Sequence, residues 1–365
     1  MRAVTWLACV VMILAAGCKK EPPRARIKSI EKLPPSPSPP RQRRRYTEQV
    51  KHDPAHVLGG EQGVDHVGVA VKDLAGARAA YEKLGFANGQ EGRLPNGLKN
   101  VNYYFGDTTY LELLTTYDAK KNPWVASFIE RNEKGAMFLM LCVFSYTHSA
   151  NLLRQKGFKV SDPFPGRIET KGVRERGRRV RGRAPTWVTF HLDGEPLPGN
   201  VTFIAYTRRL RSFMLTKLKD EKLRREKFSH PNTVLGLRSG WIAVPSVAKA
   251  KKRFEGIGLE AGGPVQVKEL EAQGLAIKAG QGTLLLLEPL RAGKGPTAAF
   301  LKRRGPGLIG LGFEVEKLDV ARDYIKTHAG LELATTNNRL LVPADKAYGV
   351  WIELRGQAPS PSAPK

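Results

Sequence analysis

The stretch GVDHVGVAVKDLAGARAAYEKLGF, residues 63–86, decides the fold. Its first half is an apolar run in which branched residues alternate with other side chains, as they do in a β-strand. Its second half has the apolar pattern of an amphipathic helix and closes on glycine, a residue common at helix ends. The stretch therefore predicts a strand followed by a helix, and it places one histidine, His66, inside the strand.

The same pattern returns three times along the chain. Each copy is an apolar strand, a turn, an amphipathic helix and a closing glycine, followed by shorter strand-like runs such as YLELL at 110–114. Such internal repeats indicate a fold assembled from similar units. We therefore predict an α+β protein of four strand–helix–strand–strand–strand (βαβββ) modules, which begin near His66, Phe138, Ser239 and Gly310.

Four such modules, with DHVGVAV opening and YLELL closing the first, resemble the vicinal oxygen chelate superfamily of glyoxalases, dioxygenases, epimerases and bleomycin-resistance proteins. Residues 63–117 are most similar to its glyoxalase-like domain subgroup. The resemblance implies two cupped half-barrel domains: modules 1 and 2 at 63–207, and degenerate modules 3 and 4 at 231–356. A helical connector is expected at 208–230. A fold of this kind hosts many enzymes and binders, so it does not name a reaction.

Strand alternation sorts the side chains of module 1 by face. His66, Gly68 and Ala70 share one face of the first strand, where two small residues should leave room beside the imidazole. In the last strand, Tyr110 and Glu112 share a face. Burying a lone carboxylate is costly, so Glu112 needs a partner.

The resemblance implies a divalent metal on this face. Superfamily ligands stand at the histidine position of the first strand and the glutamate position of the last, which His66 and Glu112 match. Imidazole plus carboxylate suits Zn, Fe, Mn, Ni or Co. A catalytic metal usually has three protein ligands, and His191 is the candidate for the third. At the glutamate position, module 3 has Leu286, whereas module 4 keeps an acid, Glu353.

Two interpretations of the His66–Glu112 pair stay open. In the first, the protein is a metal-dependent lyase, isomerase or dioxygenase that acts on a small vicinal-oxygen substrate, with Glu112 as ligand or base. In the second, the two side chains bond each other in a metal-free cup that binds a small molecule, and the ligand count favours this interpretation slightly. In either case, the expected pocket consists of Gly68, Ala70, Asn100, Asn102, Tyr110, Phe138 and Met140.

Residues 1–18 are similar to a bacterial lipoprotein signal: a basic start, a short apolar run and LAAGC ending at Cys18. Lipid on Cys18 would anchor the protein to the cell envelope, on the periplasmic side of the outer membrane in a Gram-negative cell. Residues 19–62 and 357–365 are rich in proline and polar residues and predict a disordered tether and tail. Cys142 is expected to be a small buried residue, so no disulfide framework is expected.

The formal net charge of +26 favours acidic partners. The basic tether could lie on anionic lipid headgroups. The arginine-rich loop at 171–183 suits an acidic envelope polymer, although a solvated surface hairpin explains it better. No aromatic residues interleave with its arginines to stack on bases, so no nucleic-acid partner is expected.

Overall fold

The computed structural model describes residues 53–60, 63–166, 186–207, 210–211 and 218–357, together with the backbone of 174–175 and 178–179. The predicted lipoprotein signal, Cys18 and the RQRRR run of the tether lie outside the described residues. Among the residues that are described, no helix has the length and apolar character needed to cross a membrane.

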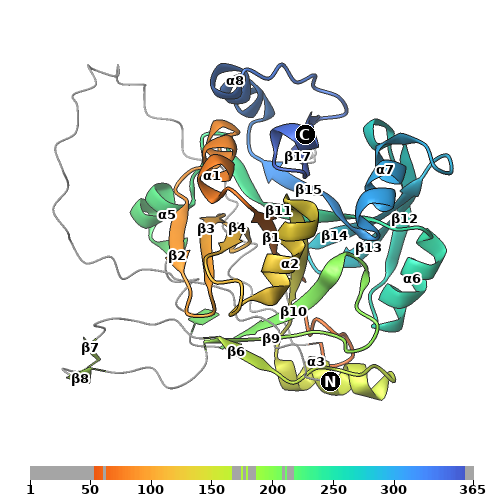
Figure 1. The fold of residues 1–365 in the computed structure, drawn as a ribbon. Coiled ribbons are helices and arrows are strands. Elements are labelled where there is room, and N and C mark those ends of the chain that lie inside the picture. The colour runs from red at the N-terminus through yellow and green to blue at the C-terminus, as the bar shows by residue number, and fades with distance from the viewer. Residues whose placement is uncertain are drawn as a thin grey trace, which may run out of the picture.

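Modules 1 and 2 form the first sheet (Figure 1). Module 1 consists of β1 (Gly63–Val71), α1 (Leu74–Lys83), β2 (Gln90–Arg93), β3 (Leu98–Tyr104) and β4 (Tyr110–Thr116). Module 2 consists of β5 (Lys134–Cys142), α3 (Tyr146–Gln155), β6 (Phe164–Gly166), β9 (Trp187–Phe190) and β10 (Val201–Tyr206). The strand order is β2-β3-β4-β1-β5-β10-β9-β6, so the antiparallel pair β1–β5 joins the modules at the centre of the sheet.

Modules 3 and 4 form the second sheet, in the order β12-β13-β14-β11-β15-β17-β16. Module 3 consists of β11 (Val234–Ala243), α6 (Val247–Gly256), β12 (Ala261–Val267), β13 (Ala272–Ala279) and β14 (Gly282–Pro289). Module 4 consists of β15 (Gly307–Val315), α8 (Leu318–Ala329), β16 (Arg339–Val342) and β17 (Trp351–Gly356). Module 4 therefore departs from the predicted pattern, because residues 331–335 form no strand after its helix.

The remaining elements connect modules. Helix α2 (Pro123–Asn132) lies between modules 1 and 2, and α7 (Gly295–Arg304) lies between modules 3 and 4. Within the expected connector, α5 (Glu221–Phe228) is helical. In the arginine-rich loop, β7 (Arg174–Glu175) and β8 (Arg178–Arg179) pair antiparallel. Short 3₁₀ turns lie at Pro198–Asn200, Lys268–Leu270 and Ala344–Lys346.

Side-chain caps begin the helices of modules 1, 2 and 3 where the sequence changes from strand to helix. Asp73 accepts a hydrogen bond from the Gly76 amide at the start of α1, and Ser145 does the same for His148 at the start of α3. Such caps satisfy amides that have no partner inside the helix. They fix the point at which the backbone leaves the central strand of each of these modules and enters the helix.

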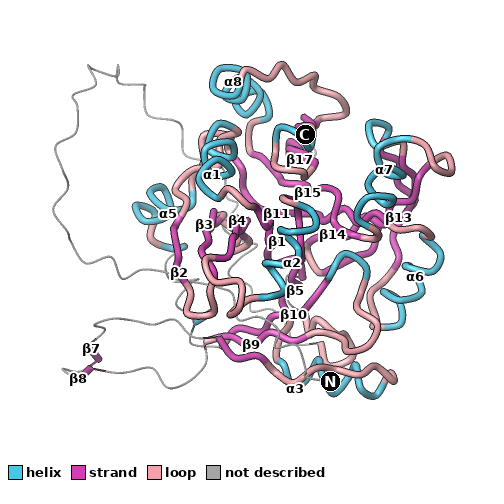
Figure 2. The backbone as a smooth tube through the Cα atoms, viewed as in Figure 1, coloured by secondary structure: helices cyan, strands magenta, loops and turns pink. Residues whose placement is uncertain are grey.

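One continuous core lies on the faces of the two sheets that point away from the cups. In module 1 this face carries the predicted branched residues Val67, Val69 and Val71, all fully buried. Strands β5 and β15, from different halves of the chain, are neighbours in this core (Figure 2). A Cβ added at Gly240 on β11 would meet the Leu139 side chain of β5. The sheets are therefore packed against each other tightly.

The ordered body begins before the predicted end of the tether. We placed residues 19–62 in the tether, but Val57 and Leu58 are completely buried in the shared core. Their carbonyl groups accept hydrogen bonds from Ser149 and from the Phe144 amide. Burial of two adjacent apolar residues and hydrogen bonds to their backbone dock this segment, and the disorder predicted for 53–60 was wrong.

Candidate functional site

The concave face of the first sheet, the first cup, brings the predicted pocket residues together. Gly68 and Ala70 on β1, Asn100 and Asn102 on β3, and Tyr110 on β4 are all buried there. On β5, Phe138 and Met140 belong to the same apolar cluster as Tyr110. Strand alternation thus placed these side chains on the correct face.

The space predicted beside the imidazole is filled. A Cβ added to Gly68 would lie 2.3 Å from the Phe138 ring, so this ring occupies the room that the glycine leaves. The same ring meets His66 edge-on, with centroids 5.9 Å apart, and Tyr110 stacks on the imidazole at 4.2 Å. The prediction of open space next to His66 was therefore wrong, because the module 2 strand supplies a large side chain at that point.

His66 is oriented by its neighbour in the sequence, Asp65. His66 Nδ1 lies 2.5 Å from Asp65 Oδ1, and the same oxygen accepts a hydrogen bond from the Tyr206 hydroxyl at 2.8 Å. A carboxylate that accepts both bonds requires a proton on His66 Nδ1.

A β-bulge explains how Asp65 reaches its neighbour. The β1–β5 register runs from Val64 opposite Leu141 directly to His66 opposite Met140, so Asp65 is the extra residue. A bulge lets two consecutive side chains lie on one side of the strand. Sequence alternation cannot locate a bulge, and Asp65 was missed for that reason.

Glu112 occupies the neighbouring strand. It pairs in register with Gly68, two residues beyond His66, and is completely buried. Its Oε1 accepts a hydrogen bond from Asn100 Nδ2 at 2.7 Å. Burial raises the pKa of the Glu112 carboxyl, whereas the charge of His66 and the bond from Asn100 oppose that rise.

Two polar atoms of this pair have no partner. His66 Nε2 and Glu112 Oε2 are buried and make no hydrogen bond to any described residue. The direct His66–Glu112 bond expected for a metal-free cup is therefore not formed, because His66 bonds Asp65 and Glu112 bonds Asn100. A buried polar atom without a partner costs about 1–3 kcal/mol.

The structure does not bring the expected third ligand to this pair. His191 follows β9, which is separated from β1 by β5 and β10 in the sheet. Its Nε2 lies 3.1 Å from Asp193, and its ring stacks on Phe164. Burial lowers the pKa of His191, with Asp193 acting in the opposite direction.

The donor set does not complete a catalytic metal site. Register places Phe138 at the histidine position of module 2 and Thr202 at its glutamate position. Within the described ranges, no group of three or more His, Cys, Asp or Glu side chains is arranged to hold a metal ion. His66 and Glu112 provide two donors where catalytic sites usually have three, so these residues do not fit a catalytic metal.

Helix α2 covers the first cup. It contacts β1, β4 and β5. Its residues Trp124, Val125, Phe128 and Ile129 belong to the apolar cluster of the concave face. The Trp124 ring stacks on Phe138, with centroids 5.7 Å apart. His66 and Glu112 are closed off from solvent by this helix and the rings beneath it.

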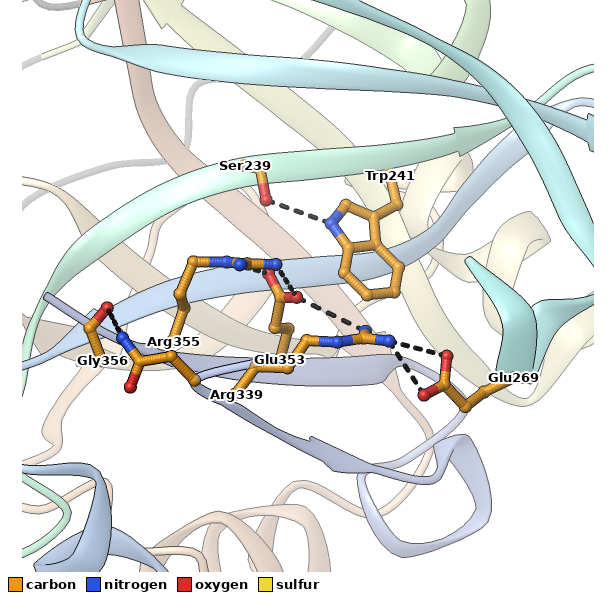
Figure 3. Close-up of polar contacts among 8 residues, drawn as sticks. Ser239, Trp241, Glu269, Arg339, Glu353, Arg355 and Gly356 are labelled. Atoms are coloured by element: carbon orange, nitrogen blue, oxygen red, sulfur yellow. Dashed lines mark hydrogen bonds and ion pairs between the residues drawn. The ribbon is translucent and has the colours of Figure 1, made fainter. Parts of the chain in front are cut away.

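The second cup carries a different set of side chains (Figure 3). Ser239 stands at the histidine position, and its hydroxyl accepts a hydrogen bond from the Trp241 indole at 3.1 Å. Trp241 is buried in the apolar cluster that α7 covers. The glutamate position of module 3 is Leu285, which pairs with Trp241, and not Leu286 as predicted, because Leu286 faces the shared core.

Glu353, the acid that module 4 keeps, is held by arginines. Arg355 Nη2 donates to its Oε1 at 2.6 Å, and Arg339 Nη1 lies 3.5 Å from the same oxygen. Arg339 also donates to both oxygens of Glu269, at 2.8 and 2.9 Å (Figure 3). The second cup therefore satisfies its carboxylate from within the chain.

A family model described as a glyoxalase-like domain matches residues 64–258, more than half of the chain. The chain belongs to the glyoxalase-like domain family. The match spans both modules of the first cup and reaches the end of α6 in module 3, which confirms the resemblance seen in the sequence. No protein with a curated description matches the chain.

Solved structures show the vicinal oxygen chelate fold. A mutant of 4-hydroxymandelate synthase from Streptomyces coelicolor is 13% identical, with a TM-score of 0.53 over 81% of this chain and 93% of that one. A hypothetical protein from Staphylococcus aureus is 9% identical, with a TM-score of 0.51 over 80% of this chain and 98% of that one. Methylmalonyl-CoA epimerase from Mycobacterium tuberculosis matches 35% of this chain and 91% of its own, at 23% identity and a TM-score of 0.31. At these identities the likeness is one of fold.

Proposed function

We propose that the first cup of this glyoxalase-like protein binds a small molecule at His66 and Glu112. The observation that carries the proposal is the pair of buried atoms, His66 Nε2 and Glu112 Oε2, that make no bond to a described residue. Each would cost about 1–3 kcal/mol if it stayed unpaired. A ligand that bonds both atoms recovers that free energy.

The surroundings of the pair suit a binding site. Asp65 and Tyr206 fix the imidazole, and Asn100 fixes the carboxylate. The walls are apolar and aromatic, which is the usual composition of small-molecule pockets with a few polar anchors. The site is thus held ready on strands, while its cover is a separate helix.

Entry of a ligand requires α2 to move. The Trp124 ring and the Phe138 ring beneath it lie between solvent and His66. We propose that a ligand displaces Trp124 and the Phe138 ring and takes the space that they leave beside Gly68. Closure of a helix over a bound molecule excludes water from its polar contacts.

A binding role is supported over a metal-dependent reaction by the donor set. Two donors fall short of the three that a catalytic metal usually has. The expected third ligand, His191, follows β9 and is engaged with Asp193. A vicinal-oxygen lyase, isomerase or dioxygenase reaction is the competing proposal.

A ligand screen on matched variants tests the proposal. The full chain is screened by thermal shift against small hydroxyl, carbonyl and amine compounds, and hits are titrated by calorimetry. We expect His66→Ala to weaken each hit at least ~10-fold, because it removes a buried polar anchor. His191→Ala is the control and should bind like wild type. Equal loss in both variants would overturn the proposal.

A second arm removes the barrier to entry. Trp124→Ala takes away the ring that lies on Phe138. If neither wild type nor Trp124→Ala binds any compound in the screen, the cup is a closed core and the proposed function is wrong.

We further propose that Cys18 carries lipid and holds this binding module at the cell envelope. The proposal rests on the LAAGC sequence and on the basic tether that follows it. Fractionation of cells that express wild type or Cys18→Ser tests it. The wild-type chain should sediment with membranes, and Cys18→Ser should not; equal distribution of the two would contradict the anchor.

A further inference from the structure

We propose that the ligand of the first cup is a small organic cation, a molecule that carries an ammonium, amidinium or guanidinium group. This inference rests on the proposed function and names its ligand class. It follows from the charges that line the cup and from a comparison of the two halves of the molecule.

The first cup holds two buried acids, and within the described residues no arginine or lysine side chain bonds either of them. Asp65 and Glu112 are at most 1% exposed. Their partners within the described chain are His66, Tyr206 and Asn100, of which the imidazole alone can carry positive charge. Buried carboxylates are normally paired with a cation or several donors. The missing partner of Glu112 Oε2 is therefore a donor group, and a cationic donor fits best.

The second half of the chain shows what a carboxylate at this position binds. Glu353 pairs in register with Gly312 as Glu112 pairs with Gly68, so the two acids hold equivalent places in their modules. Arg355 and Arg339 bring their guanidinium groups to Glu353 (Figure 3). In the first cup, no guanidinium from the described chain reaches Glu112. An external cation would make there the contact that arginines make in the second cup.

The aromatic walls favour the same class. Tyr110 stacks on His66, and the rings of Phe138 and Trp124 follow outward from it. A cation over an aromatic face gains attraction from the ring electrons, more so when water is excluded. Anions, in contrast, would meet two carboxylates and the negative faces of rings.

The overall charge of the protein does not compete with this local preference. A net charge of +26 repels cations at long range, but salt at physiological strength screens fields beyond about 8 Å. The buried acids act inside the cup, where screening is weak. The cation is therefore selected at the site and is not drawn in by the protein surface.

The test uses three probes that share one ring and differ in charge. Benzylamine, benzyl alcohol and benzoate are titrated into the full chain by calorimetry. We expect benzylamine to bind at least ~10-fold more tightly than benzyl alcohol, because one added charge contact to a buried acid is worth that factor or more. Benzoate should not bind.

Matched variants locate the effect. Glu112→Gln keeps the shape of the side chain but removes its charge, and should bring benzylamine to the affinity of benzyl alcohol. Glu353→Gln, at the equivalent position of the second cup, should bind benzylamine like wild type. Equal preference for benzylamine in wild type and Glu112→Gln would overturn the inference.

The outcomes separate this inference from the proposed function. Suppose that benzyl alcohol or benzoate binds at least as tightly as benzylamine, and that this binding is lost in His66→Ala. The proposed binding site would then stand, and the inference of a cationic ligand would be overturned. A second outcome is that none of the three probes binds wild type or the entry variant Trp124→Ala, although other compounds in the thermal-shift screen do bind. In that case the inference of a cationic ligand fails and the proposed binding function stands.

Discussion

The carboxylate of Asp65 holds two neighbours of the first cup at once. It accepts a hydrogen bond from the Nδ1–H of His66 and another from the hydroxyl of Tyr206. Hydrogen bonds to a charged group contribute about 1.5–3 kcal/mol, more than neutral ones. Asp65 is therefore the residue that sets which imidazole nitrogen faces the cup.

Replacing Asp65 should lower the free energy of unfolding more than replacing Asp193, the acid beside His191. Asp65→Ala leaves two buried donors unpaired, and we expect the free energy of unfolding to fall by about 2–4 kcal/mol. Asp193 is half exposed beside His191, so Asp193→Ala should change the free energy of unfolding by less than about 1 kcal/mol. Urea unfolding of the full-chain variants measures both, and equal losses would contradict the role given to Asp65.

The residues of this site were partly predictable. Alternation in β1 and β4 correctly placed His66, Gly68 and Glu112 on one face. Asp65 could not be placed, because the bulge that turns it toward His66 depends on the register with β5. His191 was proposed on residue type alone, and the order of strands in the sheet separates it from the pair.

Among the elements, α2 is the one that covers the first cup. Its C-terminal end is held by Arg304 of α7, whose Nη2 donates to the carbonyls of Lys134 and, at 3.4 Å, Asn132. The guanidinium also lies 5.9 Å from the Phe128 ring of α2 and 5.5 Å from the Phe300 ring of α7. A cation at a helix C-terminus satisfies carbonyls that have no partner inside the helix. Arg304 therefore fastens the cover of the first cup to the second half of the chain.

Loss of this contact should open the cup more often. Cys142 lies buried in the apolar cluster of the first cup, so the rate at which a thiol reagent modifies it reports opening of that cup. In Arg304→Gln we expect modification of Cys142, followed by peptide mass spectrometry, to be at least ~5-fold faster, which corresponds to about 1 kcal/mol.

The control for that experiment is the neighbouring residue. Arg303 is exposed on the same helix, and Arg303→Gln should leave the rate unchanged. Urea unfolding of each variant separates local opening from global unfolding. The fastening role would be contradicted if Cys142 in Arg304→Gln is modified at the wild-type rate. It would also be contradicted if the faster modification is fully explained by the lower free energy of global unfolding.

Element prediction succeeded where the pattern repeats and failed between repeats. The strand and helix that open each module are all present. Helices α2 and α7 were not predicted, although each has a proline in its first turn, a common helix-start signal. Module 4 lacks one strand because residues 331–335 pair with no neighbour, which the apolar pattern alone did not reveal.

At the scale of the whole molecule, His230 joins the two halves. Its Nδ1 accepts a hydrogen bond from the Ala87 amide, and its Nε2 donates to the Tyr104 carbonyl, both at 3.0 Å. Its ring packs against Phe105 of module 1, which in turn contacts Phe313 of module 4. These two bonds require a neutral imidazole, and burial lowers the pKa of His230 to about 4.

This histidine should make the protein sensitive to acid. The pKa is about 6.5 in an unfolded chain and about 4 in the folded one, so the stabilisation is complete above pH 6.5 and is lost as pH falls toward 4. The difference corresponds to about 3 kcal/mol. We expect His230→Gln to show a smaller fall in the free energy of unfolding between pH 7 and pH 4.5 than wild type.

His328 provides the matched control, since it is exposed on α8. His328→Gln should keep the wild-type pH profile. If His230→Gln and wild type lose the same free energy over this range, His230 does not carry the acid sensitivity of the fold.

The first cup differs from the second in leaving its acid without a cation from the described chain, and this difference is the centre of the account. It is tested most directly by a native mass spectrum of the full chain, purified without chelator, compared with that of Glu112→Gln. We predict that wild type carries the added mass of one small organic molecule and that Glu112→Gln does not. One divalent metal ion per wild-type chain, lost in Glu112→Gln, would contradict the account and favour the metal-dependent reaction.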